Sequence, residues 1–554
     1  MLILMMACAT ETTQPAGSDS AAPDSSITGG AEADLLFDVS VLHELVVTLP
    51  EADWDALREQ TRSYYSLLGE GCMEGPWESP YTYFEGEVSF DGEALGTVGV
   101  RKKGLIGSLS TERPSLKVDV DHYVDDARFH GLEKLVFNNN NQDAGRLRTC
   151  LAHDFFRDAG LVAPRCALAH VTVNGEDLGI YSHTENIDEE LVARQTGTRP
   201  DAMYEGTLSD FREEWLATFD PETDTSDGHE LEAVRVALEA GDDEVMAALD
   251  EVIDLDSFFT FWAAESLAGH WDGYNGNTNN FYTYVESGRL KFIASGPDAT
   301  FDSRSPFGEG QPIWVTTAST LANRLIQLDD GKARYLDAMQ GLLDGAWNED
   351  ARLAQVDAFD DLTRDLQTKE QRDGIAATRA VIEARAGDLE ASMGGRFTPP
   401  GLRGNPCFTD IGHVRIDFAT EFGTYPDGDL FGGGEAISDY VFRDVAYPSI
   451  ADGVSAGWAD DGRALVLTIS QLNETTFVAP YVLVDPDLFT SGAALNIDGI
   501  AAEGAILYQD ATTGGAWETV AYLGGEGVTF IEAGTSRGDT VSGVLDVGVL
   551  GSAE

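Results

Sequence analysis

The chain has 554 residues, with 35 Lys or Arg against 96 Asp or Glu, so its formal net charge at neutral pH is −61. This acidity excludes nucleic acid as a partner, because a phosphate backbone needs basic side chains to replace its counterions. The length exceeds what one hydrophobic core organises, and a hydrophobic content of 43% predicts several folded domains. The acidity is typical of a soluble surface, with recruitment of divalent cations as the alternative.

The first eight residues resemble the end of a bacterial lipoprotein export signal, because a small residue precedes Cys8 after an apolar run. We expect a lipid on Cys8 as the membrane contact, and a location in the cell envelope or outside the cell. The alternative is a short unstructured N-terminus. Residues 9–33 are rich in small and polar residues and predict a flexible tether. No later run reaches the roughly 18 apolar residues that a membrane-spanning helix needs.

The first structured part of the chain is rich in strands. Alternating apolar residues predict a strand at 41–49, a β-meander over 84–120 and two strands around a turn within 167–184. Helices are predicted from Pro50 to about Arg62 and over 144–159.

The part that follows is mainly helical. Two helices are predicted within 229–268, a hairpin over 280–294 and several helices over 316–392. Strands first and helices later indicate an α+β domain over 34–397, with a β-rich front lobe and an α-rich back lobe. Prolines and glycines at 398–406 end it, and short apolar strands over 407–554 predict a separate all-β sandwich domain.

The five cysteines do not have the spacing of a structural zinc site. In an exported protein the four inner cysteines could form two disulfides, and three pairings are possible. They are Cys72, Cys150, Cys166 and Cys407.

Five segments combine basic, amide and acidic residues in a fixed order. They are VGVRKKG at 98–104 with SLKVDV at 115–120, LVFNNNN at 135–141, VTVNG at 171–175 leading to ENID at 185–188, WDGY at 271–274 leading to NNFYTY at 279–284, and PDATF at 297–301. This succession resembles the CotH family of spore-coat-type atypical protein kinases over about residues 40–390.

The resemblance implies a two-lobed, kinase-like fold that transfers the γ-phosphate of ATP, with Mg²⁺ or Mn²⁺, to Ser or Thr of an exported or envelope protein. Such a reaction needs cations on the phosphates and a carboxylate that orients the attacking hydroxyl. The implied roles are Lys117 on the ATP phosphates and Glu185 holding that lysine, Asp272 as the catalytic carboxylate, Asn280 and Asp298 as metal ligands, and Arg101 and Lys103 as further phosphate contacts.

Each of these residues also has a structural alternative. Lys117 could be a solvated strand residue and Glu185 a helix-capping acid, while Asp272 and Asn280 could serve a turn. We expect His270, although close to Asp272, to be a packing or supporting residue rather than the base.

Two positions depart from the family pattern. The family carries Trp and Asp where this chain has Ser295 and Gly296, and its hydroxyl-rich segment after the basic strand is replaced by 104–110. These departures leave two alternatives open. One is a catalytically degenerate surface protein that acts as a binding or structural module, and the other is a different nucleotide-dependent transferase.

Overall fold

The computed structural model describes residues 30–62, 67–77, 79–302, 312–426, 434–459, 461–499, 501–512 and 516–552. Cys8 and most of the predicted tether lie outside these residues. Ala31–Asp34 form a short helix, α1, so the predicted tether reaches about three residues too far. None of the described helices is both long and apolar enough to cross a membrane.

The first strands form a closed barrel with the order β1-β2-β3-β4-β5-β7-β6. Its strands are β1 (His43–Thr48), β2 (Phe84–Phe90), β3 (Glu93–Lys103), β4 (Ser115–Asp119), β5 (Lys134–Asn138), β6 (Cys166–Val173) and β7 (Glu176–Glu185), with helix α2 (Glu51–Glu59) between β1 and β2. The predicted strands are confirmed. The closure, a parallel pairing of β1 with β6, leaves no exposed sheet edge.

The next part packs helices around a four-stranded sheet with the order β11-β10-β8-β9. The strands are β8 (Met203–Gly206), β9 (Phe219–Pro221), β10 (Phe281–Glu286) and β11 (Arg289–Ala294). The helices are α4 (Arg148–Asp158), α5 (Glu189–Thr196), α6 (His229–Leu238), α7 (Val245–Asp250), α8 (Leu255–Ala268), α9 (Tyr274–Asn277), α10 (Thr320–Ile326), α11 (Asp329–Asp344), α12 (Glu349–Thr363) and α13 (Lys369–Ser392).

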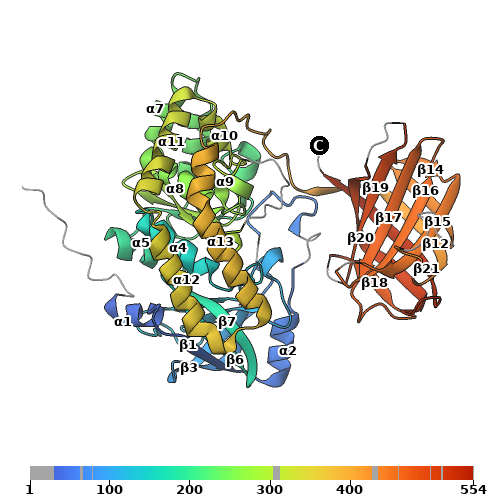
Figure 1. The fold of residues 1–554 in the computed structure, drawn as a ribbon, viewed down its shortest axis with the longest axis horizontal. Coiled ribbons are helices and arrows are strands. Elements are labelled where there is room, and N and C mark those ends of the chain that lie inside the picture. Colours follow the sequence, from blue (N-terminus) through green and yellow to red (C-terminus); the bar gives the residue numbers. More distant parts are fainter. Residues whose placement is uncertain are drawn as a thin grey trace, which may run out of the picture.

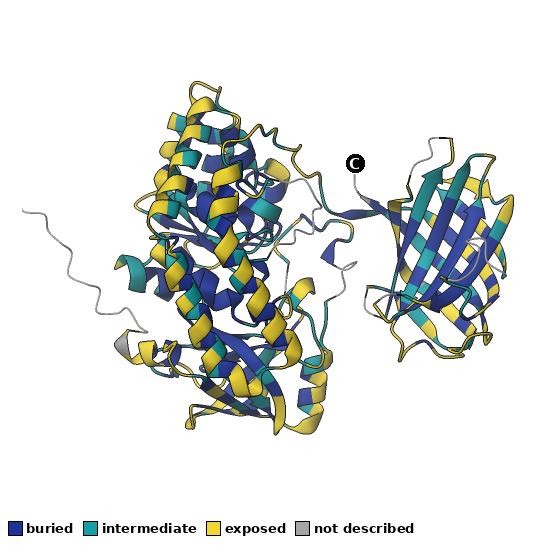
Figure 2. Ribbon diagram, in the orientation of Figure 1, coloured by how far each residue is buried: buried dark blue, intermediate teal, exposed yellow. Residues whose placement is uncertain are grey.

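The aromatic helix α8 lies at the centre of the largest hydrophobic core, while the outward faces of α12 and α13 are exposed (Figure 2). The predicted hairpin is β10 and β11. The region 229–268 holds three helices rather than the two predicted, because Gly241 and the acidic residues beside it separate α6 from α7.

Residues 393–407 lead as an extended segment to a C-terminal all-β domain (Figure 1). Its strands are β12 (Phe408–Glu421), β13 (Glu435–Phe442), β14 (Val445–Pro448), β15 (Ala451–Trp458), β16 (Ala464–Gln471), β17 (Thr476–Val484), β18 (Ala494–Ile497), β19 (Ala502–Asp510), β20 (Glu518–Ala533) and β21 (Thr540–Ser552).

The predicted sandwich of two sheets is instead one continuous antiparallel sheet that curls around its main core, with a second, smaller apolar cluster that includes Leu465 and Leu467. Bridges from Phe422 to Ala456 and from Gly434 to Val454 join the edge strand β15 to residues that flank β12 and β13. Register shifts in the long strands β12, β20 and β21 explain the difference, because bulges let a sheet bend onto itself.

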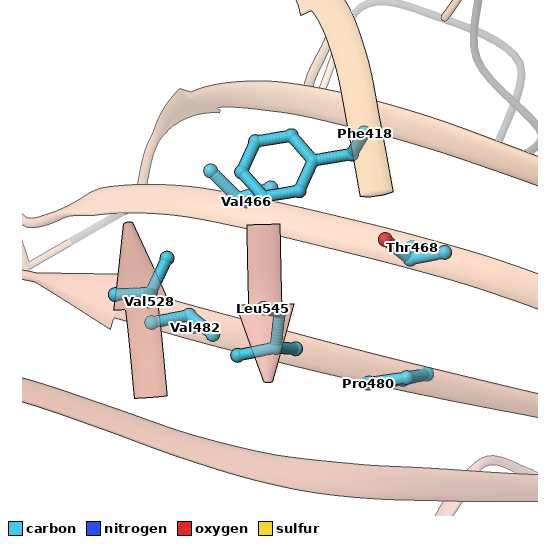
Figure 3. Close-up of a pocket in the computed structure, with 7 residues that line it drawn as sticks. All are labelled: Phe418, Val466, Thr468, Pro480, Val482, Val528 and Leu545. Carbon is cyan, nitrogen blue, oxygen red and sulfur yellow. The ribbon is translucent and has the colours of Figure 1, made fainter. Parts of the chain in front are cut away.

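The interior of this domain contains a small apolar cavity of about 10 Å³, lined by Phe418, Val466, Thr468, Pro480, Val482, Val528 and Leu545 (Figure 3). The volume is about that of one water molecule, and an apolar lining offers water too few partners. This cavity is therefore a packing defect and not a ligand site.

Two disulfides select one of the three possible pairings. Cys72 pairs with Cys407, and Cys150 on α4 pairs with Cys166 on β6. The first bond ties the loop between α2 and β2 to the start of the C-terminal domain, across a sequence separation of 335 residues.

Candidate active site

Three basic side chains project from one face of the barrel wall. Arg101 on β3 lies directly opposite Lys117 on β4, and Lys103 is two residues further along β3. Opposed residues share a face, and alternate residues along a strand do too, so these three cations lie on the same side. Lys102 points the other way and donates to the backbone oxygen of Arg58 at 2.6 Å.

Burial lowers the pKa of both Lys103 and Lys117 to about 8. Neighbouring cations lower the pKa of Lys103 further, whereas the carboxylates of Glu205 and Asp298 act in the opposite direction. Lys103 also donates to Asn138 Oδ1 at 2.8 Å. Burial and the mutual repulsion of these cations thus outweigh the nearby carboxylates, and a phosphate group bound there would stabilise the charged amines.

The structure gives Glu185 other partners than the predicted Lys117. The Glu185 carboxylate accepts hydrogen bonds from Arg165 Nη2 at 2.6 Å and from Arg194 Nη2 at 2.5 Å. The predicted alternative, a helix cap, is also wrong, because the residue that caps α5 is Asp188.

Strand register explains why Glu185 does not reach Lys117. Lys117 lies opposite Val136 on β5, which lies opposite Thr184 on β7, whereas Glu185 lies opposite Leu135. A shift of one residue along a strand reverses the direction of the side chain. Glu185 and Lys117 therefore project from opposite faces of the barrel wall.

Glu205 on β8 is a carboxylate near both lysines that the sequence analysis missed, and Glu222 also acts on Lys117. Its charge raises the pKa of both Lys103 and Lys117, and burial in turn raises the pKa of Glu205. Tyr282 donates a hydrogen bond to it. Glu205 stands in an ordinary strand sequence, so nothing in its local pattern marks it as a site residue.

Asp272 lies in the loop between α8 and β10 and accepts hydrogen bonds from three amides. Asn277 Nδ2 donates to Oδ1 at 2.6 Å, Asn279 Nδ2 to Oδ1 at 3.2 Å, and Asn280 Nδ2 to Oδ2 at 2.8 Å. Burial raises the pKa of Asp272, while these amides and the charge of Arg403 oppose the rise. The carboxylate is thus held in one orientation with part of its surface still exposed.

Asp298 sits in a short 3-10 turn after β11, beside the start of α4. Burial raises its pKa to about 7, and the nearby acids Asp143 and Asp272 raise it further. Asp143 is itself buried, where it accepts backbone hydrogen bonds from Leu147 and Arg148. Asp143 and Asp272 thus repel Asp298, and a cation bound beside Asp298 would relieve this repulsion.

Two buried acids hold the Asp272 loop from behind, and the sequence analysis did not find them. Glu265 on α8 accepts hydrogen bonds from the backbone N–H groups of Tyr274 and Asn275, both at 3.0 Å. Asp210 accepts one from the Tyr274 hydroxyl at 3.0 Å. Both roles depend on contacts between distant segments, which single-sequence patterns do not reveal.

His270 is fully buried, and its Nε2 lies 3.0 Å from the backbone oxygen of Ser295. Burial lowers its pKa to about 4, so the imidazole is uncharged at neutral pH. The imidazole joins the Asp272 loop to the Asp298 turn. A buried, uncharged imidazole with this contact fits the supporting role that we expected for it, which stays a prediction.

The segment 104–110 lies against the loop that follows β5. Asn139 Nδ2 donates to the Ser108 oxygen at 2.9 Å, and Asn141 Nδ2 donates to the Gly107 oxygen at 3.2 Å. A Cβ at Gly107 would lie 2.3 Å from Gln142 Nε2, and the backbone of Gln142 donates to Asp298. The asparagine run thus connects this glycine-containing segment with the acids.

Gly296 stands where the family carries Asp, and although it is exposed, its left-handed backbone and the close Asn280 side chain disfavour a Cβ there. Its φ is 53°, and a Cβ would lie 2.8 Å from Asn280 Oδ1. We expect Gly296→Asp to displace Asn280 from Asp272 instead of adding a metal ligand. Mn²⁺ affinity should not rise, and any transfer activity should fall about tenfold, as for loss of a hydrogen bond to a charged group.

The matched control for this change is Gly288→Asp in the turn between β10 and β11. Gly288 also has a positive φ, 76°, but a Cβ there meets nothing within 4 Å. Gly288→Asp therefore also places a side chain on a backbone with positive φ, but without the close contact that Asn280 makes at position 296. Tighter Mn²⁺ binding by Gly296→Asp than by the unaltered protein would contradict the expectation.

The residues present fit a nucleotide with a divalent cation. Carboxylate and amide oxygens are the ligands that Mg²⁺ prefers, and Asp298 and Asn280 supply one of each. The amines of Lys103 and Lys117 suit phosphate oxygens. Lys103 connects the two groups, since Lys117 and Asp298 both affect its pKa and Asp272 affects that of Asp298.

A model of the family described as CotH kinase protein matches residues 100–390, more than half of the chain. The protein belongs to the CotH family. It is 23% identical over 226 residues to inner spore coat protein H of Bacillus subtilis (strain 168), a match that covers 37% of this chain and 61% of the relative. Inner spore coat protein H-like protein of the same strain is 24% identical over 221 residues, which cover 38% of this chain and 62% of the relative. The chain thus spans about three fifths of the length of these curated relatives.

Two solved structures also resemble the chain. The proinflammatory kinase CtkA of Helicobacter pylori has a TM-score of 0.26 and 12% identity, over 53% of this chain and 95% of CtkA. A HipA, HipB and operator DNA complex of Shewanella oneidensis MR-1 has a TM-score of 0.26 and 10% identity, over 51% of this chain and 64% of the matched chain.

Proposed function

We propose that residues 34–397 form a two-lobed atypical protein kinase domain that transfers the γ-phosphate of ATP to Ser or Thr of an exported or envelope protein. The observation that carries the proposal is the convergence of basic and acidic groups from distant segments. Lys103 and Lys117 come from the barrel, while Asp272 and Asp298 come from loops at the helical part, and their charges act on one another.

In this proposal each site residue has a separate role. Lys103 and Lys117 bind phosphate oxygens, with Arg101 beside them, and Glu205 takes over the lysine-holding role first assigned to Glu185. Asp272 accepts the proton of the acceptor hydroxyl and orients its oxygen. Asp298 and Asn280 hold the divalent cation, which supplies neutralisation of charge on the phosphates.

Export and an extracellular or envelope location are supported by the spore coat relatives and by the two disulfides, since disulfides persist in oxidising compartments. A lipid on Cys8 would be the membrane contact. An ATP source there requires either phosphorylation before export or a local supply. The partners in this proposal are protein acceptors with Ser or Thr, and nucleic acid is not among them.

The test is incubation of the purified protein with ATP labelled at the γ- or α-phosphate, Mg²⁺ or Mn²⁺, and a Ser-rich acceptor. Transfer of γ-label by the unaltered protein and not by Asp272→Ala is the expected result. Transfer of α-label would instead indicate a different nucleotide-dependent transferase. Absence of nucleotide binding would favour the alternative, a catalytically degenerate surface protein that acts as a binding or structural module, which Gly296 in place of the expected Asp also favours.

A further inference from the structure

The segment 398–407, which joins the two domains, lies beyond the residues that the family model matches and has no helix or strand of its own. It is nevertheless anchored to the helical part at several points. Asn323 Nδ2 donates to the Pro400 oxygen at 2.9 Å, and Arg212 Nη1 donates to the Arg403 oxygen at 2.6 Å. Its end is fixed by the bond between Cys72 and Cys407.

The side chain of Arg403 reaches the Asp272 loop, where Nη2 donates to Asn277 Oδ1. The other end of the same amide, Nδ2, donates to Asp272 Oδ1 at 2.6 Å. An amide whose oxygen is held by a guanidinium must present its N–H groups in the opposite direction. Arg403 therefore selects the orientation of Asn277 in which the amide supports the carboxylate.

The same contact puts a positive charge beside the acids. The charge of Arg403 opposes the burial that raises the pKa of Asp272. Few cations are available for this, since the chain has 35 basic residues against 96 acidic ones.

We propose that the interdomain segment 398–407 is part of the active site and that Arg403 is a positioning residue, acting on Asp272 through Asn277. Its backbone contacts and the disulfide at Cys407 fix the position of the segment. Leu105, in the segment 104–110 that follows Lys103, packs in the same apolar cluster as Cys72 and Cys407. The disulfide is therefore also in contact with the segment next to the lysines. The kinetic test of this inference rests on the proposed function. The structural test, which measures hydrogen exchange in the Asp272 loop, does not.

The structural readout is hydrogen exchange of peptides that cover 270–280 in the full-length protein. Arg403→Ala should exchange about tenfold faster in this loop, the effect expected for loss of a hydrogen bond from a charged donor. Arg403→Lys should lie between Arg403→Ala and the unaltered protein, because it keeps the charge but not the planar fork. Arg396→Ala, at an exposed arginine earlier in the chain, is the matched control and should change nothing.

The kinetic readout is the separation of kcat from KM in γ-phosphate transfer. Arg403→Ala should lower kcat about tenfold, as for loss of a hydrogen bond from a charged donor, while the KM for ATP stays within about twofold, and Arg403→Lys should largely restore kcat. Unchanged exchange in the loop together with an unchanged kcat would overturn the proposal. If the unaltered protein transfers no phosphate, the proposed function fails, and hydrogen exchange alone decides whether the segment holds the loop.

Discussion

Asp298→Asn is expected to make the metal-free protein more stable while abolishing its metal-dependent activity. In the fold, burial and the charges of Asp143 and Asp272 raise the pKa of Asp298 to about 7. An acid with a raised pKa contributes stability below its unfolded pKa and loses it as the pH rises through the folded value. The substitution removes that loss, so the free energy of unfolding should increase by about 2 kcal/mol at pH 8.

The pH dependence separates this explanation from a general packing effect. Urea unfolding at pH 5 should show a smaller gain for Asp298→Asn than at pH 8, because at pH 5 most of the wild-type side chain is protonated. Transfer and Mn²⁺ affinity should each fall about 10²–10³-fold, the range for loss of a group that positions transition-state charge.

Asp143→Asn is the matched control within the same group of acids. Burial raises the pKa of Asp143 as well, but its carboxylate accepts backbone hydrogen bonds at the start of α4 and pairs with Arg148 Nε at 3.4 Å, contacts that an Asn side chain would break, so Asp143→Asn should destabilise the protein. If Asp298→Asn raises the free energy of unfolding and Asp143→Asn lowers it, Asp298 is the acid that destabilises the fold and is kept for function. A loss of stability in Asp298→Asn would contradict this assignment.

Replacement of Asp272 should reduce transfer about 10²–10⁴-fold, the usual contribution of a positioned general base. Asp272→Asn should be no milder than Asp272→Ala. The reason is that three amide N–H groups converge on the carboxylate, and an Asn side chain would turn an N–H group toward some of them.

Metal affinity distinguishes a base from a ligand at this position. If Asp272 orients the acceptor hydroxyl, Asp272→Ala should bind Mn²⁺ and nucleotide within a few-fold of the unaltered protein. Titration of Mn²⁺ by electron paramagnetic resonance, with Asp298→Asn as the control that loses affinity, makes the comparison. Equal losses in the two variants would show that Asp272 is a metal ligand and would move the base role elsewhere.

The individual helices and strands were predictable because the spacing of apolar residues within short stretches of sequence indicates them. Strands around Asp91-Gly92 and Asn174-Gly175 follow from alternation and turn residues, and both are present. The parallel pairing of β1 with β6 and the curling of the C-terminal sheet were not predictable. Both depend on contacts between segments far apart in the sequence, which no local pattern encodes.

The sequence indicated which types of residue form the site better than it indicated which of them contact one another. Family spacing placed Lys117, Asp272 and Asp298 in one site, and this grouping stays a prediction, although the charge of Asp298 acts on Lys103 and that of Asp272 acts on Asp298. The partner of Lys117 was wrong because the direction of Glu185 is set by strand parity, and a change of one position reverses it. Glu205, Asp210 and Glu265 were missed because their importance arises only when β8, α8 and the Asp272 loop pack together.

The bond between Cys72 and Cys407 has a mechanical consequence. It closes residues 72–407 into one covalent ring that contains most of the barrel and all of the helical part. Tension applied at the two ends of the chain would pass from residue 72 directly to residue 407 and bypass everything between them. Single-molecule stretching should accordingly lack the extension of this ring until a reductant is added, so the proposed catalytic groups would carry no load when the protein is pulled at its two ends.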